Sequence, residues 1–295
     1  MTLSRRALLT AGAVGVLSAC TPPEPRTRAT EPSSAPSPSP SSYAVPTTSA
    51  SAPAPVSTAP TTTPAAPTAR AAVVRRYQAV RPTQFGLTVP GVINRLPSAG
   101  VALTFDACGG PGGAQYDGAL IKTLRDLRTP ATLFLNARWI EANPAIFRDL
   151  AADPLFDIAN HGTRHLPLSV AGRSAYGIAG TRDAGEVYDE IAGNHELLTR
   201  ALGRPPAFFR SGTAHYDDVA TKIVAELGEQ VIGFDVNADS GARASLPQIT
   251  RAMAGVRPGS IVIAHMNRPG GATAQGMAAA LPPLLAAGTR FVHLR

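Results

Sequence analysis

The chain has 295 residues, and its 27 Lys plus Arg residues exceed its 20 Asp plus Glu residues to give a formal net charge of +7. The positive residues are nearly all arginines scattered along the chain, and no basic tract is interleaved with aromatic residues, so we expect no nucleic-acid partner. Of the two cysteines only Cys108 lies beyond residue 20, which excludes a disulfide framework.

Residues 1–20 have the pattern of an export signal. Arg5 and Arg6 precede an apolar stretch over residues 7–16, which is shorter than the roughly 20 residues that a membrane-spanning helix needs. The sequence Leu17-Ser18-Ala19-Cys20 resembles a bacterial lipobox, and the paired arginines resemble a twin-arginine signal. We expect an exported protein that is lipidated at Cys20 and held at the outer face of the bacterial cytoplasmic membrane by this anchor alone. An ordinary secretory peptide is the alternative.

The composition divides the remaining chain into a linker and one domain. From Thr21 to about Thr68 the residues are almost entirely Pro, Ser, Thr and Ala, which offer little apolar surface to bury, so residues 21–72 are predicted to be a disordered tether. Residues 73–96 are assigned to an N-terminal extension of the domain. Residues 97–295 are enough for one domain with a substantial core.

Short apolar runs that predict strands alternate with longer amphipathic stretches that predict helices. The strands are expected at residues 101–105, 131–135, 156–159, 207–209, 231–234, 261–264 and 291–293. The helices are expected at residues 117–127, 138–152, 183–202, 217–227, 246–254 and 274–286, with Asp183 and Glu186 as a capping box. Repeated strand and helix units indicate an α/β fold with a parallel sheet, open or closed into a barrel.

Residues with catalytic or metal-binding chemistry follow these predicted strands. They are Asp106, His161 and His165, Arg210, Asp235 and Asp239, and His265. Because the C-terminal ends of parallel strands meet at one edge of a sheet, we expect these side chains to converge. His161 and His165 are four residues apart and would share one face of a helical turn, where they could bind a single divalent ion. Asp235 is as consistent with a structural role as with a functional one.

These residues and their neighbours resemble the motifs of the NodB-type polysaccharide deacetylases, the fourth carbohydrate esterase family. The motifs occur in the family's order: Thr104-Phe105-Asp106, Ala131-Thr132-Leu133-Phe134, His161 with His165, Arg210, Asp239-Ser240 and Ile263-Ala264-His265. The resemblance covers most of residues 96–295. It implies a distorted (β/α)7 barrel and the metal-dependent removal of acetyl groups from N-acetylated sugars.

The resemblance also implies a role for each matched residue. His161 and His165 would bind a divalent ion, zinc in the first instance and cobalt or nickel as alternatives. Asp106 would be the base that accepts a proton from water, and Arg210 would hold its carboxylate in place. His265 would be the acid that protonates the departing amine, with its ring oriented by Asp239.

The sequence departs from the family pattern at the metal site. Ala107 occupies the position of the family's second aspartate, which is the third metal ligand. Asp106 could move onto the metal, Asp117 could reach it from beyond the glycine-rich loop, or water could complete the coordination. Cys108 suggests a thiolate ligand, but we favour the interpretation that it is a buried, inert cysteine packed against the first strand.

Two further departures from the family pattern lie in loops of the candidate site, and one further histidine is expected to lie outside it. Gly162 stands where the family has Ser or Thr after the first histidine, and Gly212 stands where the third motif has proline, so both loops should have altered geometry. His195, on a polar face of a predicted helix, is expected to be exposed to solvent.

The leading functional hypothesis is a lipid-anchored hydrolase that deacetylates an N-acetylglucosamine-containing polymer of the cell envelope. The predicted location favours peptidoglycan over chitin-like oligomers, and we expect a monomer. An O-acetyl esterase on the same scaffold is one alternative, because an ester is an easier substrate than an amide. A second is a sugar-binding pseudoenzyme that lost its metal with the change to Ala107.

Overall fold

The computed structural model describes residues 69–294. The predictions of an export signal over residues 1–20 and of lipidation at Cys20 lie outside these residues, as does all but the end of the predicted linker. The helix α1 (Arg70–Tyr77) begins within the last residues assigned to that linker. It packs on the domain, because Val73 is fully buried and the Arg70 guanidinium donates two hydrogen bonds to Asp189.

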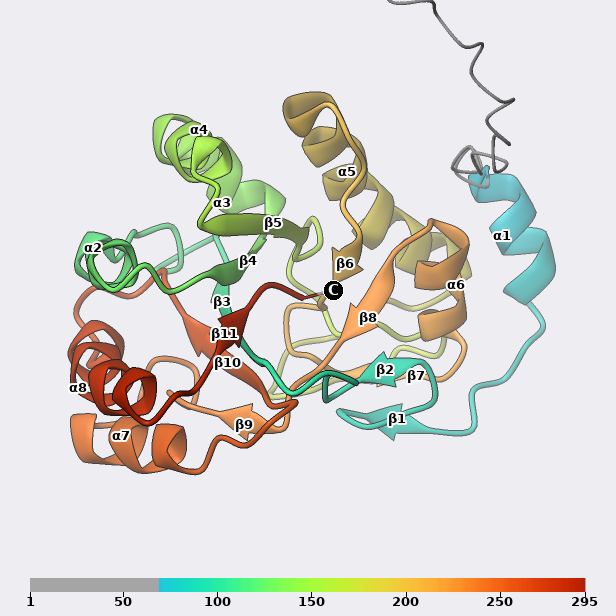
Figure 1. Cartoon of the computed structure of the whole chain (residues 1–295). Helices are drawn as coiled ribbons and strands as arrows, with labels where there is room; N and C mark the ends of the chain where they lie inside the picture. Colours follow the sequence, from blue (N-terminus) through green and yellow to red (C-terminus); the bar gives the residue numbers. More distant parts are fainter. Residues whose placement is uncertain (1–68, 295) are drawn as a thin grey trace, which may run out of the picture. The chain divides into compact units, whose positions relative to one another are not determined.

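The core of the domain is a curled parallel sheet of nine strands in the described part of the chain (Figure 1). Along the sheet the order is β2-β8-β6-β5-β4-β3-β10-β9, with β11 paired to β3. The strands are β2 (Val92–Ile93), β3 (Val101–Ala107), β4 (Ala131–Leu135), β5 (Phe156–Asn160), β6 (Phe208–Phe209), β8 (Gln230–Ile232), β9 (Val236–Asn237), β10 (Ile261–His265) and β11 (Phe291–Val292). Within residues 69–294 the two end strands, β2 and β9, do not pair, so the predicted distorted barrel is confirmed as an open, half-barrel sheet.

Helices cover the outside of this sheet (Figure 1). They are α2 (Gly118–Asp126), α3 (Ala137–Ala142), α4 (Pro144–Ala152), α5 (Ala184–Leu202), α6 (Ala220–Glu226), α7 (Leu246–Ala254) and α8 (Thr273–Ala286). The single helix predicted over residues 138–152 is divided at Asn143. Pro144 has no backbone N–H to continue the first helix but suits the first position of the second.

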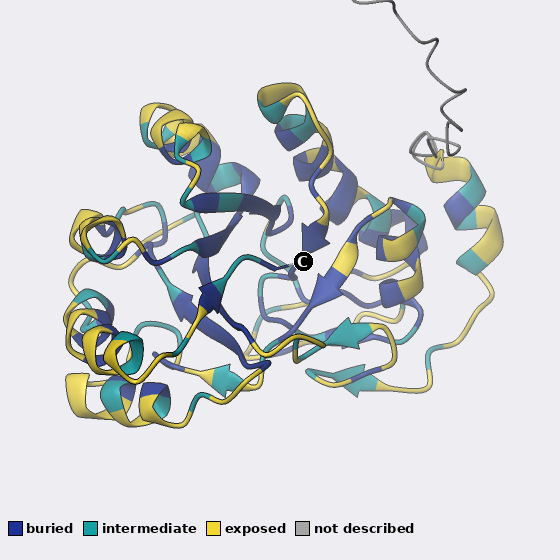
Figure 2. Cartoon of the chain, viewed as in Figure 1, coloured by how far each residue is buried: buried dark blue, intermediate teal, exposed yellow. Residues whose placement is uncertain are grey.

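The central strands are buried on both faces, as Figure 2 shows. All seven residues of β3 are buried. Burial on both faces explains why this parallel strand is mostly apolar in sequence. The largest apolar cluster joins these strands to the helices and includes Phe105, Trp139 and Leu124. None of the helices within residues 69–294 is long and apolar enough to cross a membrane.

A small second sheet was not predicted. The strands β1 (Phe85–Gly86) and β7 (Tyr216–Asp217) pair in antiparallel orientation. Asp217 was assigned to the start of a helix, but its carboxylate accepts hydrogen bonds from the backbone N–H groups of Val219 and Ala220, so α6 begins only after it.

The predicted capping box of α5 forms only in part. The Asp183 side chain accepts a hydrogen bond from the Glu186 N–H, as predicted. The Glu186 carboxylate does not return to the cap residue and instead accepts hydrogen bonds from the backbone and guanidinium of Arg182.

Candidate active site and metal centre

All but one of the side chains predicted to converge lie around or beneath a cleft at the C-terminal ends of the strands. The exception is Asp235, which lies beside the start of β10. Asp106 of β3 lies in register with His265 of β10, so the two residues are on neighbouring strands. The cleft has a volume of about 430 Å³, and its lining includes Asp106, His165, Tyr176, Thr213 and His265. The predicted convergence of these side chains at one edge of the sheet is therefore observed.

Arg210 fixes the carboxylate of Asp106 within the protein interior. Its Nη1 lies 2.8 Å from Asp106 Oδ1 and 2.8 Å from Thr104 Oγ1, and the guanidinium carbon lies 4.2 Å from the centre of the Phe134 ring. Arg210 is fully buried and Asp106 is 3 % exposed. Burial is the largest influence and would raise the pKa of Asp106. The charges of Arg210, His161 and His265, together with the hydrogen bond from Arg210, outweigh burial in sum, so the pKa is lowered and the carboxylate is ionised at neutral pH.

His161 is oriented by a hydrogen bond to the backbone. Its Nδ1–H donates to the carbonyl oxygen of Arg210 at 2.8 Å, which leaves the Nε2 lone pair directed toward the site. The Asn136 amide holds the same loop by donating to the carbonyl oxygens of His161 and Gly162. His161 is buried with 1 % exposure, so little of its ring is hydrated.

The segment between the two histidines is a loop and not the helical turn that the spacing suggested. Gly162 and His165 both have positive φ, 75° and 67°. This path still brings the rings together, with centroids 5.0 Å apart and planes at 84°. The geometric reason for the prediction was wrong, whereas the predicted meeting of the two imidazoles is observed.

The fully buried Glu190 on α5 supports this loop. Its carboxylate accepts hydrogen bonds from the N–H groups of Arg164 and Leu166, and its backbone carbonyl accepts one from Thr163. The sequence analysis did not identify Glu190. A buried glutamate within an amphipathic helix is the signal that could have found it, because an unpaired carboxylate is costly to bury.

Cys108 joins the two histidines in a cluster of potential metal ligands. One ligand atom from each of Cys108, His161 and His165 lies within 4.8 Å of the others. The Cys108 Sγ is 3.9 Å from His161 Nε2, and the buried His165 Nε2 has no hydrogen-bond partner within residues 69–294. Two imidazoles and a sulfur are a donor set that suits a divalent ion such as zinc.

The interpretation of Cys108 as an inert core cysteine does not match this position. The residue is only half-buried, and it lies beyond the end of β3 at the mouth of the sheet. Burial would raise the pKa of its thiol, but hydrogen bonds with the surrounding histidines outweigh burial and hold the pKa well below its ordinary value.

His265 and Asp239 form the second half of the site. The His265 Nδ1–H donates to Asp239 Oδ1 at 2.9 Å, and the His265 backbone N–H donates to Asp239 Oδ2 at 2.7 Å. Thr273 Oγ1 donates to the same Oδ2 at 2.9 Å. Burial is the largest influence and would lower the pKa of His265. The hydrogen bonds and charges of Asp239 and Cys108 outweigh burial in sum and raise the pKa well above its ordinary value, which favours the imidazolium.

Two glycines explain where the sequence departs from the motifs. A Cβ on Gly162 would lie 2.6 Å from the Glu190 Oε1, and its φ of 75° is a conformation that side chains disfavour. A Cβ on Gly212 would lie 2.4 Å from the carbonyl carbon of His165. Both positions therefore need glycine so that the loop carrying His165 can pack closely.

The expected exposure of His195 is wrong. The residue is 6 % exposed, and its Nδ1 lies 2.8 Å from Oε1 of the fully buried Glu229, which also accepts a hydrogen bond from Asn160. Burial raises the pKa of Glu229 to about 7.

Asp235 is structural, because its carboxylate pairs with Arg95 and accepts hydrogen bonds from Ser260 and the Ile261 N–H.

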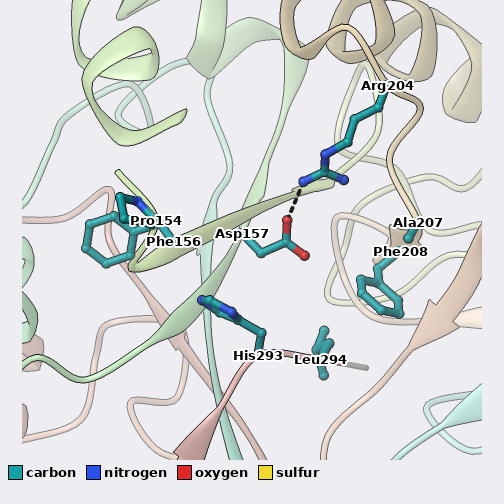
Figure 3. Close-up of a pocket in the computed structure, with 8 residues that line it drawn as sticks. All are labelled: Pro154, Phe156, Asp157, Arg204, Ala207, Phe208, His293 and Leu294. Carbon is teal, nitrogen blue, oxygen red and sulfur yellow. Dashed lines mark hydrogen bonds and ion pairs between the residues drawn. The ribbon is translucent and has the colours of Figure 1, made fainter. Parts of the chain in front are cut away.

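A second cavity of about 410 Å³ lies near the N-terminal starts of β5 and β6, away from these residues. Figure 3 shows Arg204 paired with Asp157 beside His293 and Phe208. The His293 Nε2–H donates a hydrogen bond to the Leu155 carbonyl oxygen, so the ring holds the last described strand against the start of β5. In parallel α/β folds the strand starts contribute to stability, and chemistry occurs at the opposite edge.

A carboxylate clamped by arginine, a histidine paired with aspartate and two further imidazoles at one strand edge define a hydrolase-type site. The sequence model of the polysaccharide deacetylase family matches residues 94–232. Residues 94–232 therefore belong to that family, which is a family of hydrolases.

Two curated relatives have the same printed name, chitooligosaccharide deacetylase. The protein from Sinorhizobium fredii is 29% identical over 187 residues, which cover 62% of this chain and 78% of that protein. The protein from a Bradyrhizobium species is 27% identical over 158 residues, which cover 52% of this chain and 65% of that protein.

Solved structures share the fold. A pseudoenzyme of the CE4 family from Bacillus anthracis has a TM-score of 0.58 at 20% identity, covering 70% of this chain and 68% of that one. A peptidoglycan N-acetylglucosamine deacetylase has a TM-score of 0.56 at 24% identity, covering 69% and 90%. A family 4 acetyl xylan esterase from Clostridium thermocellum, bound to cobalt, has a TM-score of 0.53 at 20% identity, covering 65% and 87%.

Proposed function

We propose that this protein is a metal-dependent hydrolase that removes N-acetyl groups from an N-acetylglucosamine-containing polymer of the cell envelope. The observation that carries the proposal is the arrangement of two differently tuned pairs on one cleft. Asp106 is held by Arg210, and His265 is held by Asp239, with both Asp106 and His265 lining the cleft that His165 also lines.

His161 and His165 are the residues that would hold the metal. The unpartnered Nε2 of His165 and the backbone-fixed tautomer of His161 fit a cation at this point. A divalent ion bound there, zinc in the first instance and cobalt or nickel as alternatives, supplies polarisation of the acetyl carbonyl and a lowered pKa of water.

The protein's own groups complete the proton transfers. Asp106 accepts a proton from the attacking water, because Arg210 keeps its carboxylate ionised and fixed. His265 donates a proton to the departing amine. Its Nδ1 is engaged by Asp239, so Nε2 is the ring atom available to the substrate, and its raised pKa keeps that proton in place at neutral pH.

The substrate class is inferred from relatives and from the N-terminal sequence. Relatives named chitooligosaccharide deacetylases and a fold neighbour named as a peptidoglycan deacetylase support an acetylated amino-sugar polymer. The proposed export signal and lipidation at Cys20 would hold a monomer beside the cell wall, which favours peptidoglycan over chitin-like oligomers.

Acetate release from peptidoglycan, N-acetylglucosamine oligomers and acetylated xylan tests the proposal. We expect release from the N-acetylated substrates, its loss after chelation, and recovery with zinc or cobalt. Asp106→Asn should abolish turnover, whereas Asp157→Asn, at the opposite end of the strands, should not. Release from xylan alone would identify an O-acetyl esterase, and release from none after metal addition would identify a pseudoenzyme.

A further inference from the structure

We propose that Cys108 is the third metal ligand, a thiolate that takes over the function of the carboxylate missing at Ala107. This inference builds on the proposed function, because it concerns the coordination of the same metal. Its first support is that one ligand atom from each of Cys108, His161 and His165 lies within 4.8 Å of the others.

The separation of the atoms suits one ion. The Cys108 Sγ is 3.9 Å from His161 Nε2, close to the roughly 3.5 Å that follows from zinc bonds of about 2.3 Å to sulfur and about 2.0 Å to nitrogen. The second imidazole, His165, has a buried Nε2 with no hydrogen-bond partner among the described residues, so this nitrogen is available to bind an ion.

The other candidates fit the third position less well. The Ala107 methyl group is fully buried in the main apolar cluster, which faces the helices. The Asp117 Oδ1 caps α2 by accepting a hydrogen bond from the Leu120 N–H, and its Oδ2 has no hydrogen-bond partner among the described residues, but Asp117 lies outside their ligand cluster. Asp106 has one oxygen paired with Arg210. Its other oxygen is 3.7 Å from His161 Nε2, but Asp106 is not part of the described ligand cluster, in which every ligand atom lies within 4.8 Å of the others.

The alternation of side chains along a strand explains why the ligand moves by one residue. Successive side chains of β3 point to opposite faces, so position 107 faces the helices whereas positions 106 and 108 face the site. A base at Asp106 and a ligand at Cys108 can therefore act side by side. The change from oxygen to sulfur should favour zinc and cobalt over magnesium and manganese.

Cobalt spectroscopy of the full chain tests this ligand directly. In a Cys20→Ser background Cys108 is the only thiol, and titration with Co²⁺ alone should produce one equivalent of binding with a sulfur-to-cobalt charge-transfer band. Cys108→Ala should lose the band and weaken Co²⁺ binding by at least about 100-fold, since loss of a residue that only orients a ligand already costs about 10- to 100-fold. Cys108→Asp should lack the band but regain much of the affinity.

Alkylation provides an independent measurement. Iodoacetamide should modify Cys108 in the metal-free Cys20→Ser protein, and saturating zinc should protect it. The Cys20→Ser control itself should bind cobalt and release acetate as the unaltered chain does. Circular dichroism of Cys108→Ala checks that this variant is folded, so that weaker metal binding is not due to unfolding. If Cys108→Ala is unfolded, Cys108→Asp is used as the test variant in its place.

The outcomes separate this inference from the proposed function. Cobalt binding that requires His161 but gives no charge-transfer band, with Cys108→Ala unchanged in affinity, would overturn the thiolate ligand and leave the metallohydrolase intact. Equal alkylation with and without zinc would overturn it as well. Absence of any cobalt binding by the unaltered chain, together with no acetate release, would refute both.

Discussion

The buried pair formed by Arg210 and Asp106 should contribute strongly to stability. The Arg210 guanidinium donates hydrogen bonds to Asp106, Thr104 and the carbonyl oxygens of Ile232 and Gly233. Arg210→Met would leave the Asp106 carboxylate uncompensated in a site where its exposure is 3 %. Removing one partner of a buried pair costs about 3–5 kcal/mol, a large part of the roughly 5–15 kcal/mol typical of a folded domain.

Urea unfolding followed by the fluorescence of Trp139, the only tryptophan, measures this loss. Adding Asp106→Asn to the Arg210→Met protein removes the unpaired charge, so the double variant should be more stable than the sum of the single losses by about 1–3 kcal/mol. Neither variant should release acetate. The matched control is Arg204→Met, whose guanidinium pairs with Asp157 at a site where the arginine side chain is 56% exposed, and it should cost less than about 1 kcal/mol.

Two results would refute this reasoning. One is a loss of less than about 1 kcal/mol on Arg210→Met, which would mean that the pair is no better than a surface contact. The other is strict additivity in the double variant, which would mean that the arginine stabilises the fold through its carbonyl contacts and not through the carboxylate.

Three further predictions concern Glu190, which supports the histidine loop, the buried Glu229, and Tyr176 on the lining of the cleft. Glu190→Ala should lower Co²⁺ affinity by about 10- to 100-fold in titrations, because the histidine loop loses its carboxylate acceptor, whereas Glu186→Ala on the same helix should not. Burial raises the pKa of Glu229 from 4.5 to about 7. The contribution of Glu229 to the free energy of unfolding is therefore complete below about pH 4.5 and is lost as pH rises through about 7. Between about pH 5 and about pH 8, the free energy of unfolding of Glu229→Gln should rise by about 2–3 kcal/mol relative to that of the wild type, as measured by urea unfolding. Tyr176 is 75% exposed on the lining of the cleft, so Tyr176→Ala should raise KM for oligomers with little change in kcat, and an unchanged KM would remove it from the substrate surface.

The order of strands and helices could be predicted from the sequence because the central strands are short and continuously apolar. β3, β4 and β10 lie side by side beneath helices, and their runs are bounded by polar or glycine-containing segments. The strands β1, β2, β7 and β9 were missed or displaced. Each of these strands has two residues and forms only by pairing with a strand that is distant along the chain, so no local periodicity predicts it.

The site was predictable to the same extent as the strands that carry it. Asp106 and His265 lie at the ends of buried strands and Arg210 directly after one, and their convergence follows from parallel topology. The side of the strand to which Cys108 belongs depends on where β3 ends, which spacing alone does not reveal. The burial of His195 depends on Glu229, which is 34 residues away along the chain, and the helical pattern contains no sign of that partner.

Two aspartates in similarly buried positions have opposite effects because their partners differ. Arg210 does not release a proton in a protein, so its charge can only hold Asp106 in the ionised form that a base requires. His265 does exchange a proton, so the same electrostatic attraction from Asp239 raises the pKa of the ring and creates an acid. The choice of arginine or histidine beside a carboxylate therefore determines which of the two pairs accepts a proton and which donates one, before any substrate is bound.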